Sequence, residues 1–185
     1  FLIVCLAITI FEWSMMSKNK NYYYLGIVFL IFSFYTFYKI NYDYNNSIII
    51  LFILFISVFT DIGGYVFGKL FKGPKLTSIS PKKTYSGLIG AFFLPIFLTF
   101  LFLEVATINL EKFENFNNIY LFLILISAVS QIGDIIISYF KRLSNIKDTG
   151  KIIPGHGGLL DRIDGMIFAF PFSYLLLSTN FFLVI

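Results

Sequence analysis

The chain has 185 residues, of which 58% are hydrophobic and only 13% are charged, and its formal net charge is +4. Its mean hydropathy is +0.84. Soluble domains carry about 25% charged residues, so this composition excludes an ordinary soluble protein and indicates an integral membrane protein. The single cysteine, Cys5, lies in an apolar run, so no intrachain disulfide is expected.

Several apolar runs are close to the roughly 20 residues that cross a bilayer as a helix. We therefore expect an all-α, polytopic membrane protein with one transmembrane domain over residues 1–185. The chain begins at Phe1 with neither a methionine nor a signal peptide, so we expect further membrane segments upstream. Six spanning segments are predicted, at about residues 1–16, 22–38, 47–67, 87–103, 119–138 and 166–185.

The basic residues indicate how these segments are oriented. Lys and Arg in short loops favour the cytoplasmic side. If the segments alternate, twelve of the 14 basic residues fall in loops 17–21, 68–86 and 139–165. We therefore place these three loops in the cytoplasm. The twelve are Lys18, Lys20, Lys69, Lys72, Lys75, Lys82, Lys83, Lys141, Arg142, Lys147, Lys151 and Arg162.

Two acidic residues occur in the first and third segments. Glu12 stands beside Trp13 near the predicted cytoplasmic end, and we expect it to be an interfacial charge. Asp61 lies inside an apolar run, in TDIGGYVFGK, where an ionisable group costs about 2.5 to 3.5 kcal/mol at the bilayer centre. Asp61 is therefore either a site residue or a helix-end charge. Gly64 and Gly68 are four residues apart and predict close approach of another helix.

The loop at 68–86 is basic and ends in SPKKTYSG, just before the fourth segment. Lysines, hydroxyl groups and the first N–H groups of a helix are suited to holding phosphate. The alternative is a basic cluster attracted to anionic lipid headgroups. The residues concerned are Ser80, Lys82, Lys83 and Thr84.

The most polar stretch is Ser138 to Asp164, which holds ten titratable side chains. Asp134 lies just before it, at the cytoplasmic end of the fifth segment. Gly157 and Gly158 would let the backbone approach a phosphate closely. His156 beside them either donates to a phosphate or is a loop histidine bonded to backbone.

Four carboxylates can therefore meet at one depth, facing many basic residues. Carboxylates bind Mg²⁺, which commonly bridges protein oxygens to substrate phosphates, while Lys and Arg offset developing charge. No nucleophile paired with a base is evident, which favours direct phosphoryl or nucleotidyl transfer between two substrates. The carboxylates are Asp61, Asp134, Asp161 and Asp164.

The run S-x-x-K-R-x4-K-D-x5-P-G-H-G-G-x-x-D-R-x-D, from Ser138 to Asp164, resembles the signature of the phosphatidate cytidylyltransferases (CDP-diacylglycerol synthases). The Asp61 segment resembles that family's D-x-x-A-Y-x-x-G-K, with Gly64 in place of alanine. Residues Ser80 to Gly87 resemble its S-P-x-K-T-x-x-G. The resemblance covers about residues 47–175, and the first 40 residues match only in hydropathy.

The resemblance implies a Mg²⁺-dependent enzyme of the bacterial cytoplasmic membrane, often a homodimer. Its site, in loops 68–86 and 139–165, would face the cytoplasm, and CTP and phosphatidate would react there to give CDP-diacylglycerol and pyrophosphate. Asp134 and Asp161 would bind the metal, and a monovalent cation such as K⁺ is a possible second ion. No nucleic acid partner is expected. Lys141, Arg142 and Asp164 complete the implied catalytic set, and the implied substrate-binding set is Asp61, Ser80, Lys82, Lys83, Thr84, Lys147, Asp148, His156, Gly157, Gly158 and Arg162.

Three other functions are weighed against this one. Related CTP-using membrane enzymes, acting on an archaeal ether lipid phosphate or as a polyprenol or phytol kinase, are the nearest. A cation-coupled transporter would explain intramembrane aspartates but gives no reason for the glycine-rich loop or the basic pocket. A structural subunit would leave Asp61 and Asp134 uncompensated.

Overall fold

The structure, a computed structural model, describes residues 1–44, 47–77, 80, 83–106, 116–150, 152 and 157–179. This part of the chain is built from helices, which confirms the predicted all-α fold. The helices are α1 (Leu2–Ser17), α2 (Tyr23–Tyr44), α3 (Ser47–Phe71), α4 (Tyr85–Ala106), α5 (Phe116–Leu143), α6 (Leu160–Ile163) and α7 (Met166–Ser178).

Four of these helices, α2 to α5, are long and apolar enough to cross a membrane. The apolar helices α1 and α7 are shorter, with 16 and 13 residues. The protein is therefore a polytopic helical membrane protein. Hydropathy predicts six segments, and each corresponds to a helix, whereas the short α6 in the polar loop was not expected.

Local backbone conformation explains where two long helices end. α3 stops where Lys72 and Gly73 take positive φ angles of 53° and 114°, followed by Pro74, which cannot continue a helix. α5 stops two residues before Asn145, whose φ is 55°. Both helices thus end in tight turns, and the polar loops that follow begin at defined points.

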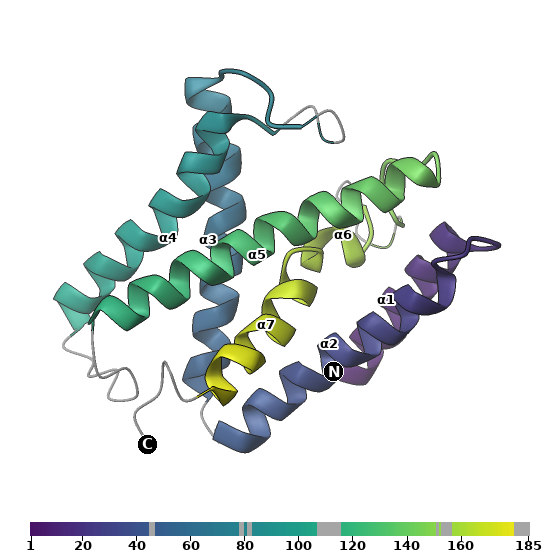
Figure 1. Cartoon of the computed structure of the whole chain (residues 1–185), viewed down its shortest axis with the longest axis horizontal. Helices are drawn as coiled ribbons and strands as arrows, with labels where there is room; N and C mark the ends of the chain where they lie inside the picture. Colours follow the sequence, from purple (N-terminus) through teal and green to yellow (C-terminus); the bar gives the residue numbers. More distant parts are fainter. Residues whose placement is uncertain are drawn as a thin grey trace.

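The long helix α5 runs through the middle of the molecule. α4 lies on one side of it, α7, α2 and α1 lie on the other, and α3 crosses behind it (Figure 1). The C-terminal end of α3 lies at the top of that view, and those of α1 and α5 lie at its right. The C-terminal ends of α2 and α4 lie at the opposite end. The loops predicted to be cytoplasmic therefore follow helix ends on the same side.

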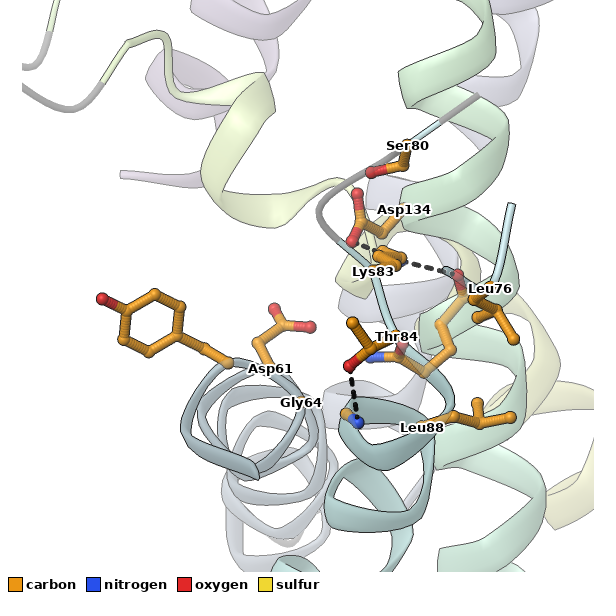
Figure 2. Close-up of a pocket in the computed structure, with 11 residues that line it drawn as sticks. Asp61, Gly64, Leu76, Ser80, Lys83, Thr84, Leu88 and Asp134 are labelled. Carbon is orange, nitrogen blue, oxygen red and sulfur yellow. Dashed lines mark hydrogen bonds and ion pairs between the residues drawn. The ribbon is translucent and has the colours of Figure 1, made fainter. Parts of the chain in front are cut away.

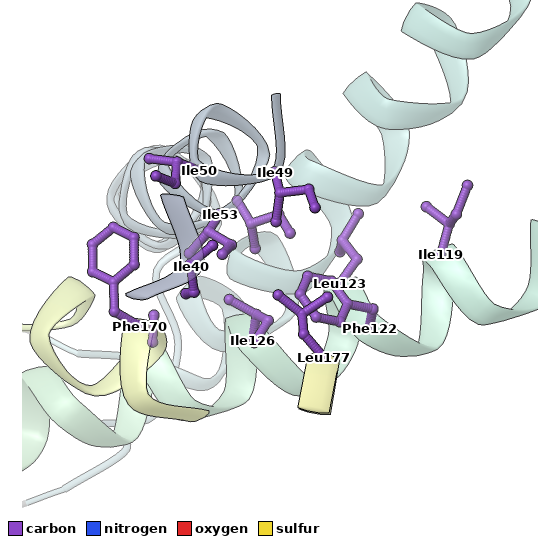
Figure 3. Close-up of a cluster of buried hydrophobic side chains, with 12 residues drawn as sticks. Ile40, Ile49, Ile50, Ile53, Ile119, Phe122, Leu123, Ile126, Phe170 and Leu177 are labelled. Carbon is purple, nitrogen blue, oxygen red and sulfur yellow. The ribbon is translucent and has the colours of Figure 1, made fainter. Parts of the chain in front are cut away.

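The larger of two buried apolar clusters lies in the half of the bundle away from these loops (Figure 3). It joins Ile40 of α2, Ile53 of α3 and Ile126 of α5, each of them fully buried, with Leu177 of α7. Since lipid tails are as apolar as these side chains, close van der Waals packing rather than water exclusion holds such a core together.

Small residues let α3 and α4 approach each other closely. A Cβ atom at Gly63 would overlap the carbonyl group of Gly90, and one at Gly87 would lie 2.7 Å from the carbonyl oxygen of Gly64. The close approach predicted from Gly64 and Gly68 is therefore present, but Gly63 and Gly90 need it most. At Gly64 an added Cβ would only reach ordinary contact, 3.7 Å from Ala91.

Candidate active site

A cavity of about 260 Å³ opens between α3, the start of α4 and α5, where Leu76, Lys83 and Thr84 of the basic loop line it (Figure 2). α3 contributes Asp61 to its wall and α5 contributes Asp134. The cavity thus joins elements that the sequence analysis singled out separately. Its lining consists of Asp61, Gly64, Tyr65, Leu76, Ser80, Lys83, Thr84, Gly87, Leu88, Gln131 and Asp134.

Lys83 and Asp134 form an ion pair in this cavity, with 2.6 Å between Nζ and Oδ2. The ammonium group also donates to the Gln131 carbonyl oxygen at 3.4 Å, and the Ser138 hydroxyl donates to the other oxygen of Asp134 at 3.3 Å. Gln131, Asp134 and Ser138 are three to four residues apart, so they share one face of α5. The ion pair of Lys83 with Asp134 therefore links the basic loop to α5.

The backbone of the basic loop holds Lys83 in position. Leu76 N–H donates to the Lys83 carbonyl oxygen at 2.8 Å, and Tyr85 N–H donates to that of Pro74 at 3.2 Å. Thr84 Oγ1 accepts from Gly87 N–H at 3.1 Å, which caps the start of α4. Thr84 therefore has a structural task, although its side chain also lines the cavity.

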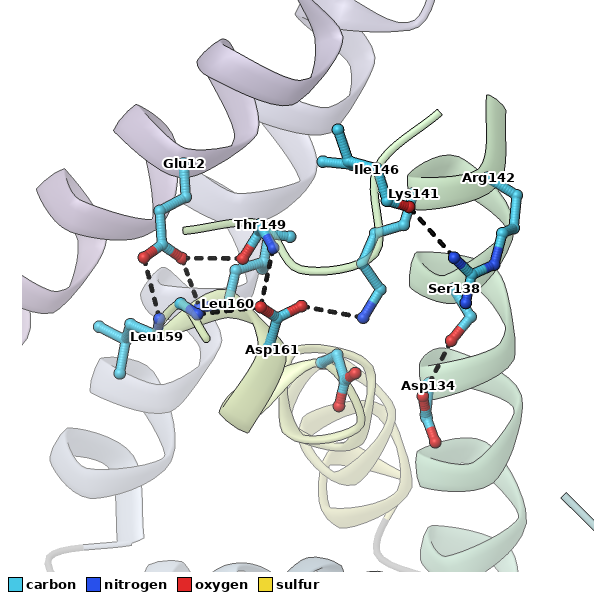
Figure 4. Close-up of polar contacts among 12 residues, drawn as sticks. Glu12, Asp134, Ser138, Lys141, Arg142, Ile146, Thr149, Leu159, Leu160 and Asp161 are labelled. Carbon is cyan, nitrogen blue, oxygen red and sulfur yellow. Dashed lines mark hydrogen bonds and ion pairs between the residues drawn. The ribbon is translucent and has the colours of Figure 1, made fainter. Parts of the chain in front are cut away.

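A second polar cluster surrounds Asp161 in α6 (Figure 4). Lys141 donates to Oδ1 at 2.9 Å, while Oδ2 accepts from the backbone N–H groups of Thr149 at 2.8 Å and Gly158 at 2.9 Å. Burial would raise the pKa of the Asp161 carboxyl, but these hydrogen bonds outweigh it and lower the pKa below its ordinary value. Asp161 is therefore held as a carboxylate.

A glycine is required where this loop turns back toward α6. Gly157 has φ of 85°, and a Cβ there would lie 2.7 Å from Asp161 Oδ2. The glycines of the sequence motif thus allow the loop to wrap the Asp161 carboxylate. Whether they also admit a phosphate stays a prediction.

Asp164 lies at the junction of α6 and α7 and is buried, with Gly165 N–H donating to Oδ1 at 2.9 Å. Burial raises the pKa of the Asp164 carboxyl well above its ordinary value, and the charge of Asp134 raises it further, while Lys141 acts in the opposite direction. Asp164 is therefore close enough to both clusters to respond to their charges.

Comparison with known proteins assigns the chain to a family. The sequence model described as "Cytidylyltransferase family" matches residues 1–180. A phosphatidate cytidylyltransferase of Rickettsia prowazekii is 37% identical over 164 residues, which cover 86% of this chain and 72% of that protein. The chain belongs to the cytidylyltransferase family. Two other phosphatidate cytidylyltransferases are similar to this family member: that of Rickettsia felis, 39% identical over 86% of this chain and 72% of its own length, and that of Staphylococcus haemolyticus, 32% identical over 95% and 68%.

The predicted site residues of this cytidylyltransferase fall into two groups on the same side of the bundle. Asp61, Ser80, Lys83, Thr84 and Asp134 line the cavity. The second group surrounds the loop after α5 and consists of Lys141, Gly157, Gly158 and Asp161, with Asp164 at the adjoining junction.

The remaining predicted residues have other contacts, are exposed or are not described. Arg142 donates to the Ile146 carbonyl oxygen at 3.2 Å and thereby closes the end of α5. Lys147, Asp148 and Arg162 are exposed. Lys82 and His156 lie outside the described residues, so their roles stay predictions.

Glu12 is the residue that sequence reasoning missed. Expected as an interfacial charge, it is only 1% exposed. Its carboxylate accepts hydrogen bonds from Thr149 Oγ1 at 3.1 Å and from the N–H groups of Leu159 at 2.9 Å and Leu160 at 2.8 Å. The expectation was wrong because the donors lie 137 to 148 residues away in sequence. A carboxylate followed by five more helical residues, Trp13 to Ser17, was the one signal in the sequence that Glu12 lies inside the helix.

Proposed function

We propose that this protein transfers the cytidylyl group of CTP to phosphatidate, which gives CDP-diacylglycerol and pyrophosphate in phospholipid biosynthesis. The observation that carries the proposal is the ion-paired Lys83 and Asp134 in a cavity between spanning helices, in a chain of the cytidylyltransferase family. Such a site gives a charged group at membrane depth the partners it needs.

The reaction needs two phosphates to meet. An oxygen of the phosphatidate phosphate forms a bond to the α-phosphorus of CTP, and the bond to the bridging oxygen breaks, so that pyrophosphate leaves. Lys83, Lys141 and Arg142 would offset negative charge on the transferring and leaving groups. Ser80 and Arg162, with Lys82, Lys147 and His156, are further candidates for contacting the phosphates.

We propose Asp134 and Asp161 as the ligands of a Mg²⁺ ion, with a monovalent cation such as K⁺ as a second possibility. Mg²⁺ is often held by one or two carboxylates and substrate phosphates, and when bound it would stabilise charge on the bridging and leaving oxygens. Among the described residues no three His, Cys, Asp or Glu side chains gather closely enough to hold a metal by themselves. A Mg²⁺ site formed by two carboxylates, with substrate oxygens as further ligands, would be consistent with these residues.

The electrostatics of the site support a bound cation. Asp164 is buried and experiences the negative charges of both Asp134 and Asp61. Clustered like charges are unfavourable unless a cation compensates them. Lys83 and Lys141 each compensate one carboxylate, and a bound metal ion would favour the charged form of the others.

The lipid substrate would reach the cavity sideways. Tyr65 lines the cavity and is 68% exposed, and Ile132, next to the lining residue Gln131, is 54% exposed. An opening on the lipid-facing side would let the phosphate of phosphatidate enter while its acyl chains stay between lipids.

We propose further that the site faces the cytoplasm at the bacterial cytoplasmic membrane and that the protein forms a homodimer. Light scattering in detergent would measure the mass of the dimer.

Labelled nucleotides test the proposed reaction. In mixed micelles with phosphatidate and Mg²⁺, label at the α-phosphate of CTP should enter the lipid product, and label at the γ-phosphate should leave as pyrophosphate. A kinase would instead transfer the γ label to the lipid, and this outcome would reject the proposal. Chelation of Mg²⁺ should stop the transfer, and addition of Mg²⁺ should restore it.

A further inference from the structure

We infer that Glu12 is a positioning residue, whose buried carboxylate fixes the loop before α6, and with it Asp161 of that helix, in the geometry needed for transfer. The role attributed to Asp161 rests on the proposed function. The contacts of Glu12 with the loop do not, and they can be tested separately.

The carboxylate of Glu12 reaches both ends of the loop between α5 and α6. Thr149 Oγ1, near the start of that loop, donates to Oε2, which also accepts from Leu160 N–H, while Leu159 N–H donates to Oε1. One side chain of α1 thus joins two segments that are otherwise ten residues apart (Figure 4).

Asp161 bridges the same two segments from the other side. Its Oδ2 accepts from Thr149 N–H and Gly158 N–H. Thr149 therefore donates to both carboxylates, through its backbone to Asp161 and through its hydroxyl to Glu12. If Glu12 no longer holds Thr149, one of the three donors that orient Asp161 loses its support.

The loop is shaped to receive this carboxylate. A Cβ at Gly150 would lie 2.7 Å from Glu12 Oε1, and one at Gly158 would lie 2.5 Å from Oε2. Any larger residue at either position would displace the side chain. The backbone at Gly150 and Gly158 therefore packs closely around the Glu12 carboxylate.

Both oxygens must be acceptors. Because each of them receives a backbone N–H, from Leu159 or from Leu160, an amide nitrogen in either place would face a donor. Glu12→Gln therefore keeps the shape of the side chain and removes one of these hydrogen bonds. Removing a partner that orients a metal-binding or catalytic carboxylate typically lowers metal affinity or activity 10- to 100-fold.

The main test compares Glu12→Gln with a matched control on the same helix. Thr9→Val is isosteric and equally buried, and the Thr9 hydroxyl bonds only to carbonyl groups of α1. Glu12→Gln should lower kcat for cytidylyl transfer about 10- to 100-fold and change KM for CTP less than about threefold. Thr9→Val should stay within about twofold of the unchanged protein.

A double-mutant cycle separates positioning from general damage. Thr149→Val removes the hydroxyl and keeps the backbone donor to Asp161. If the two side chains act through one contact, Glu12→Gln combined with Thr149→Val should be no slower than Glu12→Gln alone, within about twofold. Multiplicative losses, or a kcat of Glu12→Gln near that of the unchanged protein, would overturn the inference.

A readout independent of activity follows the loop itself. Ile152 is 51% exposed, so Ile152→Cys in a Cys5→Ala background can carry a spin label. Glu12→Gln should increase the mobility of the label, and Thr9→Val should not. An unchanged spectrum in Glu12→Gln would contradict the inference.

If Glu12→Gln cannot be purified folded, Thr149→Val replaces it in the same two measurements. A more mobile label together with a reduced kcat would support the role of Glu12. An unchanged spectrum and an unchanged kcat would reject it. Absence of CDP-lipid from the unchanged protein would instead reject the proposed function.

Discussion

Asp134 and Asp161 each face one lysine, but the two ion pairs have different surroundings. The Lys83 and Asp134 side chains are 16% and 24% exposed, whereas those of Lys141 and Asp161 are 10% and 7% exposed. Asp161 also accepts two backbone N–H groups. At the residue scale, Asp134 is therefore the carboxylate more open to a ligand, and Asp161 is the one more firmly held.

Asp134→Asn should lower the rate of cytidylyl transfer at least about 100-fold, because the amide loses the charge that pairs with Lys83 and that is proposed to bind Mg²⁺. Activity in mixed micelles measures this. Asp43→Asn is the matched control, since Asp43 also pairs with a lysine, Lys39 at 2.8 Å, but at the opposite end of the bundle. If both variants keep full activity, Asp134 is not part of the site.

Asp161→Asn should destabilise the protein by about 3 to 5 kcal/mol at neutral pH, because it leaves Lys141 buried without its partner. Thermal unfolding in detergent measures the change. Asp148→Asn, at an exposed carboxylate of the loop before α6, should change the unfolding free energy by less than about 0.5 kcal/mol.

The pH dependence of this difference has a definite sign. Because the pKa of Asp161 is lower in the folded protein, its stabilising contribution is present above the ordinary Asp pKa of about 3.9 and is lost as the pH falls through the folded-state pKa. The difference in unfolding free energy between Asp161→Asn and the unchanged protein should therefore become smaller below about pH 4. A gap that stays constant from pH 7 to 3 would contradict the assignment.

At the scale of elements, the contact of α3 with α4 sets the width of the cavity. Asp61 precedes the glycines of α3, and Lys83 and Thr84 precede those of α4. The close approach at Gly63 and Gly90 therefore brings the two walls together.

Gly63→Ala should destabilise the protein by about 1 to 3 kcal/mol, because the new methyl group would overlap the Gly90 backbone. Gly64→Ala on the same helix is the control, since its Cβ would only touch Ala91 at 3.7 Å. Unfolding temperatures in detergent compare the two variants. Equal temperatures would show that the helices can separate at no cost.

Hydropathy predicted which segments are helical but not where the helices end. The second segment was predicted to stop at residue 38, and α2 continues to Tyr44; the fifth was predicted at 119–138, and α5 runs from Phe116 to Leu143. Hydropathy marks the part of a helix that lies in hydrocarbon, and these helices continue into polar surroundings. The short α6 lies in a polar loop with no apolar period to reveal it.

For the candidate site too, the sequence indicated individual residues but not all of the contacts between them. Asp61 and Asp134 were found because a carboxylate in an apolar run is costly without partners. The partners of Glu12 could not be predicted, because they depend on how distant helices pack. Sequence pattern gives local chemistry, and the long-range packing that buries Glu12 has no local signature.

At the scale of the whole molecule, the site is assembled around one end of α5. This helix packs against α3, α4 and α7. α1 contacts it through Trp13, whose ring centroid lies 5.3 Å from that of Phe140, and is also joined to it through α6 and the preceding loop. The basic loops predicted to be cytoplasmic follow helix ends on that side (Figure 1). Both substrates would therefore meet at one membrane surface.

This arrangement predicts the labelling pattern of single cysteines in a Cys5→Ala background. A membrane-impermeant maleimide should label Lys18→Cys and Lys72→Cys from the cytoplasmic side, and Tyr42→Cys only from the other side. All three positions are exposed, and the first two lie in predicted cytoplasmic loops. Right-side-out and inverted vesicles compare the two sides. Labelling of all three from one side would contradict the topology.

The contacts of Glu12 also bear on how the protein is made. Thr149 follows Glu12 by 137 residues, so at roughly 5 to 20 residues per second it is synthesised about 7 to 27 s later. During that interval α1 carries a carboxylate without its native donors, which favours keeping that end of the helix hydrated at the membrane surface. α1 would then take its final depth only after the loop before α6 has emerged, so the contacts between Glu12 and that loop would form late in assembly.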